Sequence, residues 1–307
     1  MEKSILVAID GSPYSSNSLE YLHQTFGTEA PPELHLISVV PAGSGGLEWM
    51  YDVDPLRKES PLTQKRTALA NRYLKDAKNR LMRKGYPEDK IHLRTETATS
   101  GVASTLHREA DKGNYDAILV GRRGVGAFGG MLFGSTSAEL ITQCHTVPIW
   151  VIDGEVTSKR FLLAVHTQPQ SLVAADHLAF ILGNHPQMEI LLYHSNTVFG
   201  RQKSVKAEEF HTQWGKEWCD KYLDIENFLF YAHAQVLMDG GIARHRIIQL
   251  PAQMHIDVGA DLLKQAKKNN CGTLVLGRGP RTERRLLKGA SDKTLQQAQN
   301  IAVWLVG

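Results

Sequence analysis

The stretch AILVGRRGVGAFGGMLFGST, residues 117–136, says most about the fold. Its first four residues are apolar and predict a short strand buried on both faces of a sheet. The glycines that follow let backbone N–H groups approach a ligand without a Cβ in the way. A helix is expected to begin near Thr136, because Glu139 three residues later completes a capping box. The stretch therefore predicts a buried strand, a glycine-rich loop and a helix N-terminus in succession.

A loop of this kind is suited to phosphate. Free N–H groups and the positive end of the helix dipole attract anions, and the hydroxyls of Ser135 and Thr136 add donors. Arg122 and Arg123 are candidate counter-charges, with solvated loop charges as the alternative. The loop is neither a P-loop nor a dinucleotide fingerprint, so the glycines alone leave a purely structural role open.

The same pattern occurs twice, at an offset of 156 residues. Residues 5–10 (ILVAID) lie over residues 161–166 (FLLAVH), and residues 117–122 (AILVGR) lie over residues 273–278 (TLVLGR). A length of 307 residues also favours two domains. The sequence predicts a duplication, with domains at 1–154 and 159–307.

Each half alternates short apolar runs with longer helical stretches. In the first half, strands are expected at 5–9, 34–40, 117–120 and 147–152, and helices at 15–26, 63–84 and 102–112. Alternating strands and helices indicate βαβ units, hence an α/β fold with a doubly wound parallel sheet in each domain. Ligands of such sheets bind at the carboxyl ends of the strands. In the second half, the spacing of Trp214, Trp218, Tyr222 and Ile225 predicts one helix with an apolar stripe.

Composition narrows the functional class. A net charge of +3 over this length does not favour nucleic acid as a partner. The three cysteines have no disulfide or zinc spacing, and no apolar run is long enough to span a membrane. The expectation is a cytoplasmic protein without a membrane partner.

Spacing within the glycine loop resembles the nucleotide loop of the universal stress protein family. That signature is Gly, two residues, Gly, nine residues, then Gly-Ser, and here it reads Gly121, Gly124, Gly134 and Ser135. Residues 7–15 (VAIDGSPYS) are similar to the opening motif of the family, and residues 147–151 (VPIWV) to its closing strand. The chain is identified as a tandem, two-domain member, with Rossmann-like domains related to the adenine-nucleotide hydrolases.

The resemblance implies ATP as the ligand of the first domain, with Mg²⁺ or Mn²⁺ on its phosphates. Asp10, in the motif with Gly11 and Ser12, would accept hydrogen bonds from the adenosine portion, and the backbone of Val39 would meet adenine. The glycines of the loop and Ser135 would hold ribose and phosphates, helped by Thr136 and Arg122. The alternatives are a helix-capping or turn role for Asp10 and a core role for Val39.

The second half departs from this pattern. At the same offset Asp10 becomes His166, Val39 becomes Ser195 and Gly124 becomes Pro280, so a second ATP site is not expected. In place of the glycine loop stands a basic loop with Arg278, Arg281, Arg284, Arg285 and Lys288. This loop is either a solvated surface or a contact for an anion or an acidic partner. The thirteen histidines show no metal-ligand spacing, so no metal is expected on the protein itself.

The resemblance favours a nucleotide-dependent regulator or protector in the stress response, with no catalytic residues. Alternatives are slow ATP hydrolysis or phosphotransfer, or an adaptor without nucleotide; the Ser-Gly-Gly-x-Asp-Ser loop of the pyrophosphatases is missing. The two halves would pair as a pseudo-dimer through final strands carrying Trp150 and Trp304, with core packing of each tryptophan as the alternative. A homodimer and an unidentified protein partner remain open.

Overall fold

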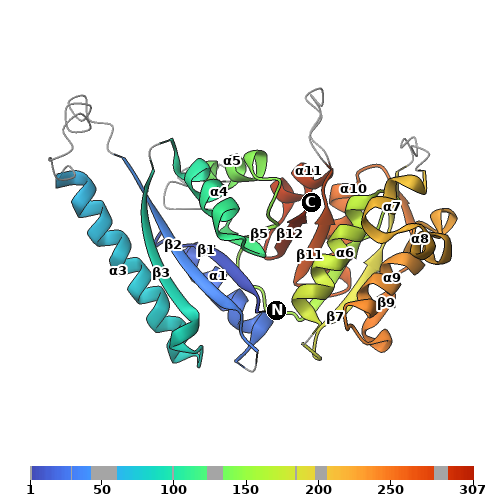
Figure 1. Ribbon diagram of the computed structural model, residues 1–307, viewed down its shortest axis with the longest axis horizontal. Coiled ribbons are helices and arrows are strands. Elements are labelled where there is room, and N and C mark those ends of the chain that lie inside the picture. The colour runs from blue at the N-terminus through green and yellow to red at the C-terminus, as the bar shows by residue number, and fades with distance from the viewer. Residues whose placement is uncertain are drawn as a thin grey trace. The chain divides into compact units, whose positions relative to one another are not determined.

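The computed structural model describes residues 2–28, 30–42, 61–98, 100–122, 134–183, 185–197, 206–279 and 290–307. The chain divides into two compact units, Met1–Ile152 and Asp153–Gly307, and each is described by itself. In Figure 1 the first unit runs from blue to green and the second from yellow-green to red. Among the described residues, no helix combines the length and the apolarity needed to cross a bilayer.

The first unit is built on a five-stranded parallel sheet. Its strands are β1 (Ser4–Ala8), β2 (Glu33–Pro41), β3 (Ile91–Ala98), β4 (Ala117–Gly121) and β5 (Ile149–Ile152). Their order is β3-β2-β1-β4-β5, with every pair parallel. This order confirms the doubly wound fold. The sequence analysis missed β3, because an exposed edge strand lacks the apolar run that marks its buried neighbours.

Helices cover both faces of this sheet (Figure 1). They are α1 (Pro13–Phe26), α3 (Pro61–Arg83), α4 (Val102–Gly113) and α5 (Ser135–Gln143), with a 3₁₀ turn at Glu88–Lys90. α1 packs against α3, β4 and β5, and α4 packs against α5, β2 and β3. Ser12 caps α1 by accepting a hydrogen bond from the Ser15 N–H, and Pro13 fits the first turn, where its missing N–H costs nothing.

The second unit repeats the arrangement. Its main strands are β6 (Arg160–Ala164), β7 (Glu189–Tyr193), β9 (Ile247–Gln249), β11 (Thr273–Gly277) and β12 (Ala302–Val306). They are parallel in the order β12-β11-β6-β7-β9, which corresponds strand for strand to the first unit. An additional parallel pair joins β8 (Ser195–Thr197) to β10 (Gln253–His255).

Helices of the second unit differ in one respect from the prediction. They are α6 (Pro169–Leu182), α7 (Glu208–Trp214), α8 (Lys216–Tyr222), α9 (Phe230–Asp239), α10 (Val258–Lys268) and α11 (Ala290–Gln297), with 3₁₀ turns at Ile225–Asn227 and Arg244–Arg246. The single helix predicted through Trp214 and Ile225 is wrong, because Gly215 adopts φ 77° and separates α7 from α8. The aromatic rings still follow one another in a row of tilted contacts, with Trp214–Trp218 centroids 6.3 Å apart and Trp218–Tyr222 centroids 5.1 Å apart.

Each unit has one tryptophan at the centre of its core. Trp150 is fully buried and stacks on Phe26, with ring centroids 6.1 Å apart. Trp304 is fully buried and meets the edge of Phe161 at 5.3 Å. Both tryptophans therefore contribute to core packing within their own units, and the pairing of the two halves stays a prediction.

Candidate functional site

The strand order places the predicted residues of the first unit around one edge of the sheet. β1 and β4 are neighbours, with Val7 opposite Leu119, but their connections lead to opposite sides of the sheet. This is the switch point at which doubly wound sheets form a ligand crevice beyond the strand ends. The segment 10–12 follows β1, Gly121 ends β4, and α5 begins at Ser135.

Asp10 organises the turn between β1 and α1. Its Oδ1 accepts a hydrogen bond from the Ser12 N–H at 2.9 Å and another from the Ser15 hydroxyl. The Asp10 N–H in turn donates to Ser15 Oγ at 3.3 Å. Ser12 and Ser15 are buried, whereas Asp10 is exposed. The turn role is therefore present, and it holds the Asp10 carboxylate in one orientation beyond the end of β1.

Gly11 has a conformation and an environment that exclude other residues. Its φ of 77° lies in the left-handed region, and a Cβ at this position would lie 2.3 Å from Cε2 of Tyr73. Tyr73 comes from α3, so this contact fixes the turn after β1 against the long helix. The sequence analysis missed Tyr73, because no motif signals a ring that packs over a glycine far away in the chain.

The two ends of the glycine loop are joined by hydrogen bonds. The Gly134 N–H donates to the Arg122 carbonyl at 3.0 Å, and the Ser137 hydroxyl donates to the Gly121 carbonyl at 2.8 Å. The start of α5 is thereby fastened to the end of β4. Gly124 and Arg123 lie outside the described residues.

The predicted capping box at the start of α5 is wrong. Gly134, not Thr136, is the N-cap residue, and it makes no side-chain hydrogen bond to the helix. The first N–H that bonds within the helix belongs to Ala138, which donates to the Gly134 carbonyl at 3.0 Å. The N–H groups of the preceding three residues, beginning with the exposed Ser135, have no acceptor inside the helix and are suited to an anion.

Arg122 and Val39 take positions that the sequence left open. The Arg122 side chain is only 1% exposed, which contradicts the alternative of a solvated loop charge. The backbone N–H of Arg122 donates to the Ile152 carbonyl at 2.9 Å and continues the sheet beyond β4. Val39 is half-buried near the end of β2, so a core role and a backbone contact to a ligand are compatible there.

Comparison with known families identifies the first unit. The sequence model of the universal stress protein family matches residues 1–153. The chain belongs to this family. Two successive units with the same strand order make it a tandem member of the universal stress proteins. No curated protein sequence matches the chain.

Solved universal stress proteins share this tandem fold. A universal stress protein from Archaeoglobus fulgidus DSM 4304 has 15% identity and a TM-score of 0.61, over 99% of this chain and 95% of its own. A candidate family member from Pseudomonas aeruginosa UCBPP-PA14 has 14% identity and a TM-score of 0.56, over 99% and 93%. A universal stress protein in complex with cAMP covers 49% of this chain and 96% of its own, at 18% identity and a TM-score of 0.32, too low to support an argument.

The second unit of this universal stress protein closes the corresponding position with a histidine. The Gln168 N–H donates to His166 Nδ1 at 3.3 Å, and the His166 N–H donates to Ser171 Oγ at 3.0 Å. These bonds reproduce the turn around Asp10. The Gly277 backbone lies near the same imidazole, so the ring stands between the ends of β6 and β11. Desolvation lowers the pKa of His166 to about 4, so the ring is neutral at pH 7.

More histidines fill the interior behind this turn. The His233 Nδ1–H donates to the Leu229 carbonyl at 2.6 Å, so Nε2 accepts from the Ser171 hydroxyl at the same distance. Burial lowers the pKa of His233 to about 3. His194 stacks on Phe228 with ring centroids 4.0 Å apart. His194 and His233 are thus part of the core of this unit. Most of the predicted basic loop lies outside the described residues.

One cluster of possible metal ligands was missed by the sequence analysis. Glu33, His35 and His92 lie together on β2 and β3, although 57 residues of chain separate the two histidines. The only signal in the sequence is the alternation of Glu33 and His35 on one face of a strand. The register that sets His92 beside His35 could not be foreseen, because β3 itself was not recognised.

Proposed function

We propose that the first unit binds ATP at the switch-point crevice and that the protein acts as a nucleotide-dependent regulator. In this proposal the Asp10 carboxylate accepts hydrogen bonds from the ribose hydroxyls, and the Val39 backbone meets adenine. Phosphates lie against Gly121, Gly124 and the N-terminus of α5, where Ser135 and Thr136 add hydroxyl donors. Mg²⁺ or Mn²⁺ accompanies the phosphates.

The observation that carries the proposal is the contrast between Asp10 and His166. Both side chains accept the same turn hydrogen bond, from Ser12 and Gln168 respectively. A carboxylate is therefore not required by the turn, because a neutral imidazole does the same work in the second unit. Asp10 is exposed beyond the end of β1, whereas His166 is half-buried near the Gly277 backbone at the equivalent strand ends. A ligand rich in hydroxyl donors, such as ribose, accounts for the carboxylate.

The start of α5 supplies the second half of the argument. Its first N–H groups have no acceptor inside the helix, and they follow directly on a loop whose ends are joined at Arg122 and Gly134. Donors of this kind, at a helix N-terminus beside a strand end, favour phosphate oxygens. Doubly wound folds bind nucleotides beyond the carboxyl ends of the strands at this switch point.

Regulation is favoured over rapid catalysis. Fast hydrolysis needs a base within hydrogen-bonding reach of a water molecule. Oδ1 of Asp10 is already engaged by Ser12 and Ser15, which opposes its use as that base. Slow hydrolysis of ATP is the second candidate function. In the regulatory role, an unidentified protein partner would bind differently to the occupied and the empty crevice.

The proposal is tested by identifying what the purified protein retains and binds. Protein is denatured, and the released small molecules are identified by chromatography and mass spectrometry; stripped protein is then titrated with fluorescent ATP and challenged with ATP or GTP. We expect adenine nucleotide to be retained, and ATP to displace the probe better than GTP. A stripped, folded protein that binds no adenine nucleotide would refute the proposal.

A further inference from the structure

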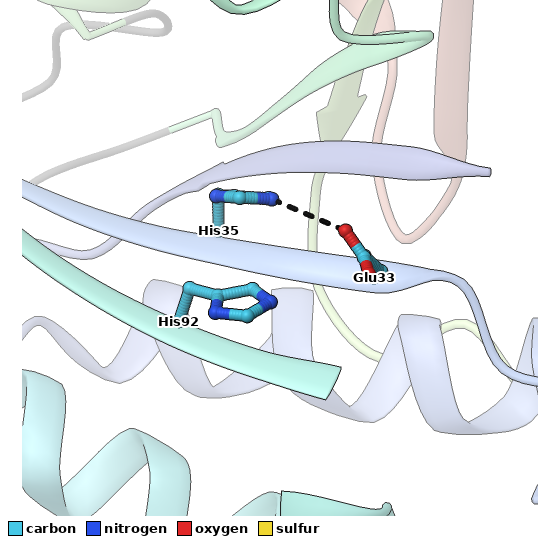
Figure 2. Close-up of side chains that lie close together, drawn as sticks. All are labelled: Glu33, His35 and His92. Atoms are coloured by element: carbon cyan, nitrogen blue, oxygen red, sulfur yellow. Dashed lines mark ion pairs between the residues drawn. The ribbon is translucent and has the colours of Figure 1, made fainter. Parts of the chain in front are cut away.

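Two histidines and a glutamate gather near the amino ends of β2 and β3. His35 lies directly opposite His92 in the parallel register, and Glu33 precedes His35 by two residues on the same face of β2. Figure 2 shows the His35 ring pointing toward the Glu33 carboxylate, with the His92 ring on the adjacent strand. The crevice of the proposed nucleotide site lies at the carboxyl ends of the strands, so this cluster is a separate site.

Distances within the cluster suit a small metal ion. Nε2 of His35 lies 3.7 Å from Oε2 of Glu33, and one ligand atom from each of the three residues lies within 4.8 Å of the others. The imidazole rings are stacked, with centroids 4.6 Å apart and an interplanar angle of 28°. Bonds of about 2.0–2.2 Å to zinc require donor atoms slightly closer together than this. Small side-chain rotations achieve that, because His92 is exposed and the other two are half-buried.

We propose that Glu33, His35 and His92 form a zinc site, with water as the fourth ligand. Two imidazoles and one carboxylate match the borderline ligand preference of Zn²⁺, and Mg²⁺ or Ca²⁺ would require an all-oxygen set. The partial exposure of the cluster leaves room for the water. Zinc bound here links the edge strand β3 to β2.

Surrounding charges are compatible with a cation. Arg94 follows His92 on the same face of β3, but its guanidinium is paired with Glu96 at 2.6 Å and with Glu109 of α4 at 2.8 Å. The edge of the Tyr115 ring closes the other side of His35, with centroids 4.9 Å apart.

The second unit provides an internal comparison. The positions of His35 and His92 correspond in the sheet to Leu191 and Ile248, which are paired in the same way. Glu33 corresponds to Glu189, whose carboxylate is bound by Arg160 at 2.6 Å. The residue equivalent to Arg160 in the first unit is Ser4, which carries no charge. The fold thus needs only an aliphatic pair at these positions. The first unit has two histidines in place of that pair and lacks the arginine, and all three differences favour a cation.

The test uses the full-length chain without an affinity tag, stripped of metal and nucleotide. Zn²⁺ is titrated by calorimetry, and Co²⁺ is added as a spectroscopic probe of the ligand set. His35→Leu copies the residue of the second unit, and His92→Gln alters an exposed side chain, so at least one variant should fold normally. His107→Gln is the matched control, because His107 also lies beside a carboxylate, 3.2 Å from Asp111, but on α4.

We expect one Zn²⁺ per chain in the parent and in His107→Gln. Loss of one of three protein ligands should weaken binding at least about tenfold in His35→Leu and His92→Gln, and remove the visible absorption of tetrahedral Co²⁺. Zinc should raise the melting temperature of the parent but not of these two variants. Zinc binding that is absent from the folded parent, or unchanged in folded His35→Leu and His92→Gln, would overturn the proposal. Because nucleotide is absent from this experiment, its outcome is independent of the ATP site.

Discussion

Replacing Asp10 by histidine distinguishes the role of this residue in the turn from its proposed role in ligand binding. Asp10→His copies His166, whose Nδ1 accepts the corresponding turn hydrogen bond at 3.3 Å. The turn should therefore survive, and the free energy of unfolding should fall by less than about 1 kcal/mol, the net contribution of one hydrogen bond. Asp10→Ala, in contrast, removes the acceptor of both Ser12 and Ser15, which are buried. Leaving such groups unsatisfied costs about 1–3 kcal/mol.

The same two variants should lose affinity for ATP to a similar extent. A hydrogen bond to a charged group is worth about 1.5–3 kcal/mol, and about 1.4 kcal/mol corresponds to a factor of ten in Kd. Both Asp10→His and Asp10→Ala should therefore raise the Kd for ATP by about 10- to 150-fold. Asp10→Asn keeps the acceptor oxygen without the charge and should lie between parent and histidine variant.

Calorimetry gives the affinity, and hydrogen exchange of the β1 and β2 amides gives the local stability. The reasoning about the ligand is refuted if Asp10→His binds ATP as tightly as the parent. The reasoning about the turn is refuted if Asp10→His is as unstable as Asp10→Ala.

Two further predictions concern stability. Backbone strain alone should cost Gly11→Ala about 1–3 kcal/mol of stability, and the loss should be larger because the new Cβ would lie 2.3 Å from the Tyr73 ring. Gly27→Ala is the control, because Gly27 has φ 61° and a Cβ there would meet no atom within 4 Å. Equal losses of stability in thermal unfolding of the two variants would exclude the clash. Acid should destabilise the second unit through His233. The folded pKa of this histidine is about 3, below the unfolded value near 6.5. Its contribution to the free energy of unfolding is therefore fully present above pH 6.5 and is lost as the pH falls toward 3. For this group, the free energy of unfolding should fall by up to about 1.4 kcal/mol per pH unit. The loss is measured as reduced hydrogen-exchange protection in α6 and α9. Constant protection between pH 6.5 and 4.5 would contradict the prediction.

Apolar runs and the internal repeat were sufficient to predict the fold. Buried parallel strands such as β1 and β4 are nearly all apolar, so their sequence reveals them without any structure. β3 escaped because six of its eight residues are not buried and polar side chains dominate. The break at Gly215 escaped because aromatic spacing alone does not distinguish one helix from two that pack their rings together.

The candidate site was predictable only where neighbouring residues define it. Asp10, Gly134 and Ser135 stand beside strand or helix ends, and motif and topology together were enough to expect them there. Contacts between distant segments were beyond reach, as with Tyr73 over Gly11. The exchange of Asp10 for His166 was visible in the sequence, but the preserved turn hydrogen bonds were not.

Our proposal gives each chain one ATP site, formed by the first unit. The most direct test is a calorimetric titration of the stripped protein with ATP and Mg²⁺, beside Gly124→Pro, which introduces the proline of the second unit into the first loop. A proline removes a backbone donor and restricts the loop, so the account predicts one site in the parent and its loss in the variant. No site or two sites in the parent, or an unchanged site in Gly124→Pro, would contradict the account.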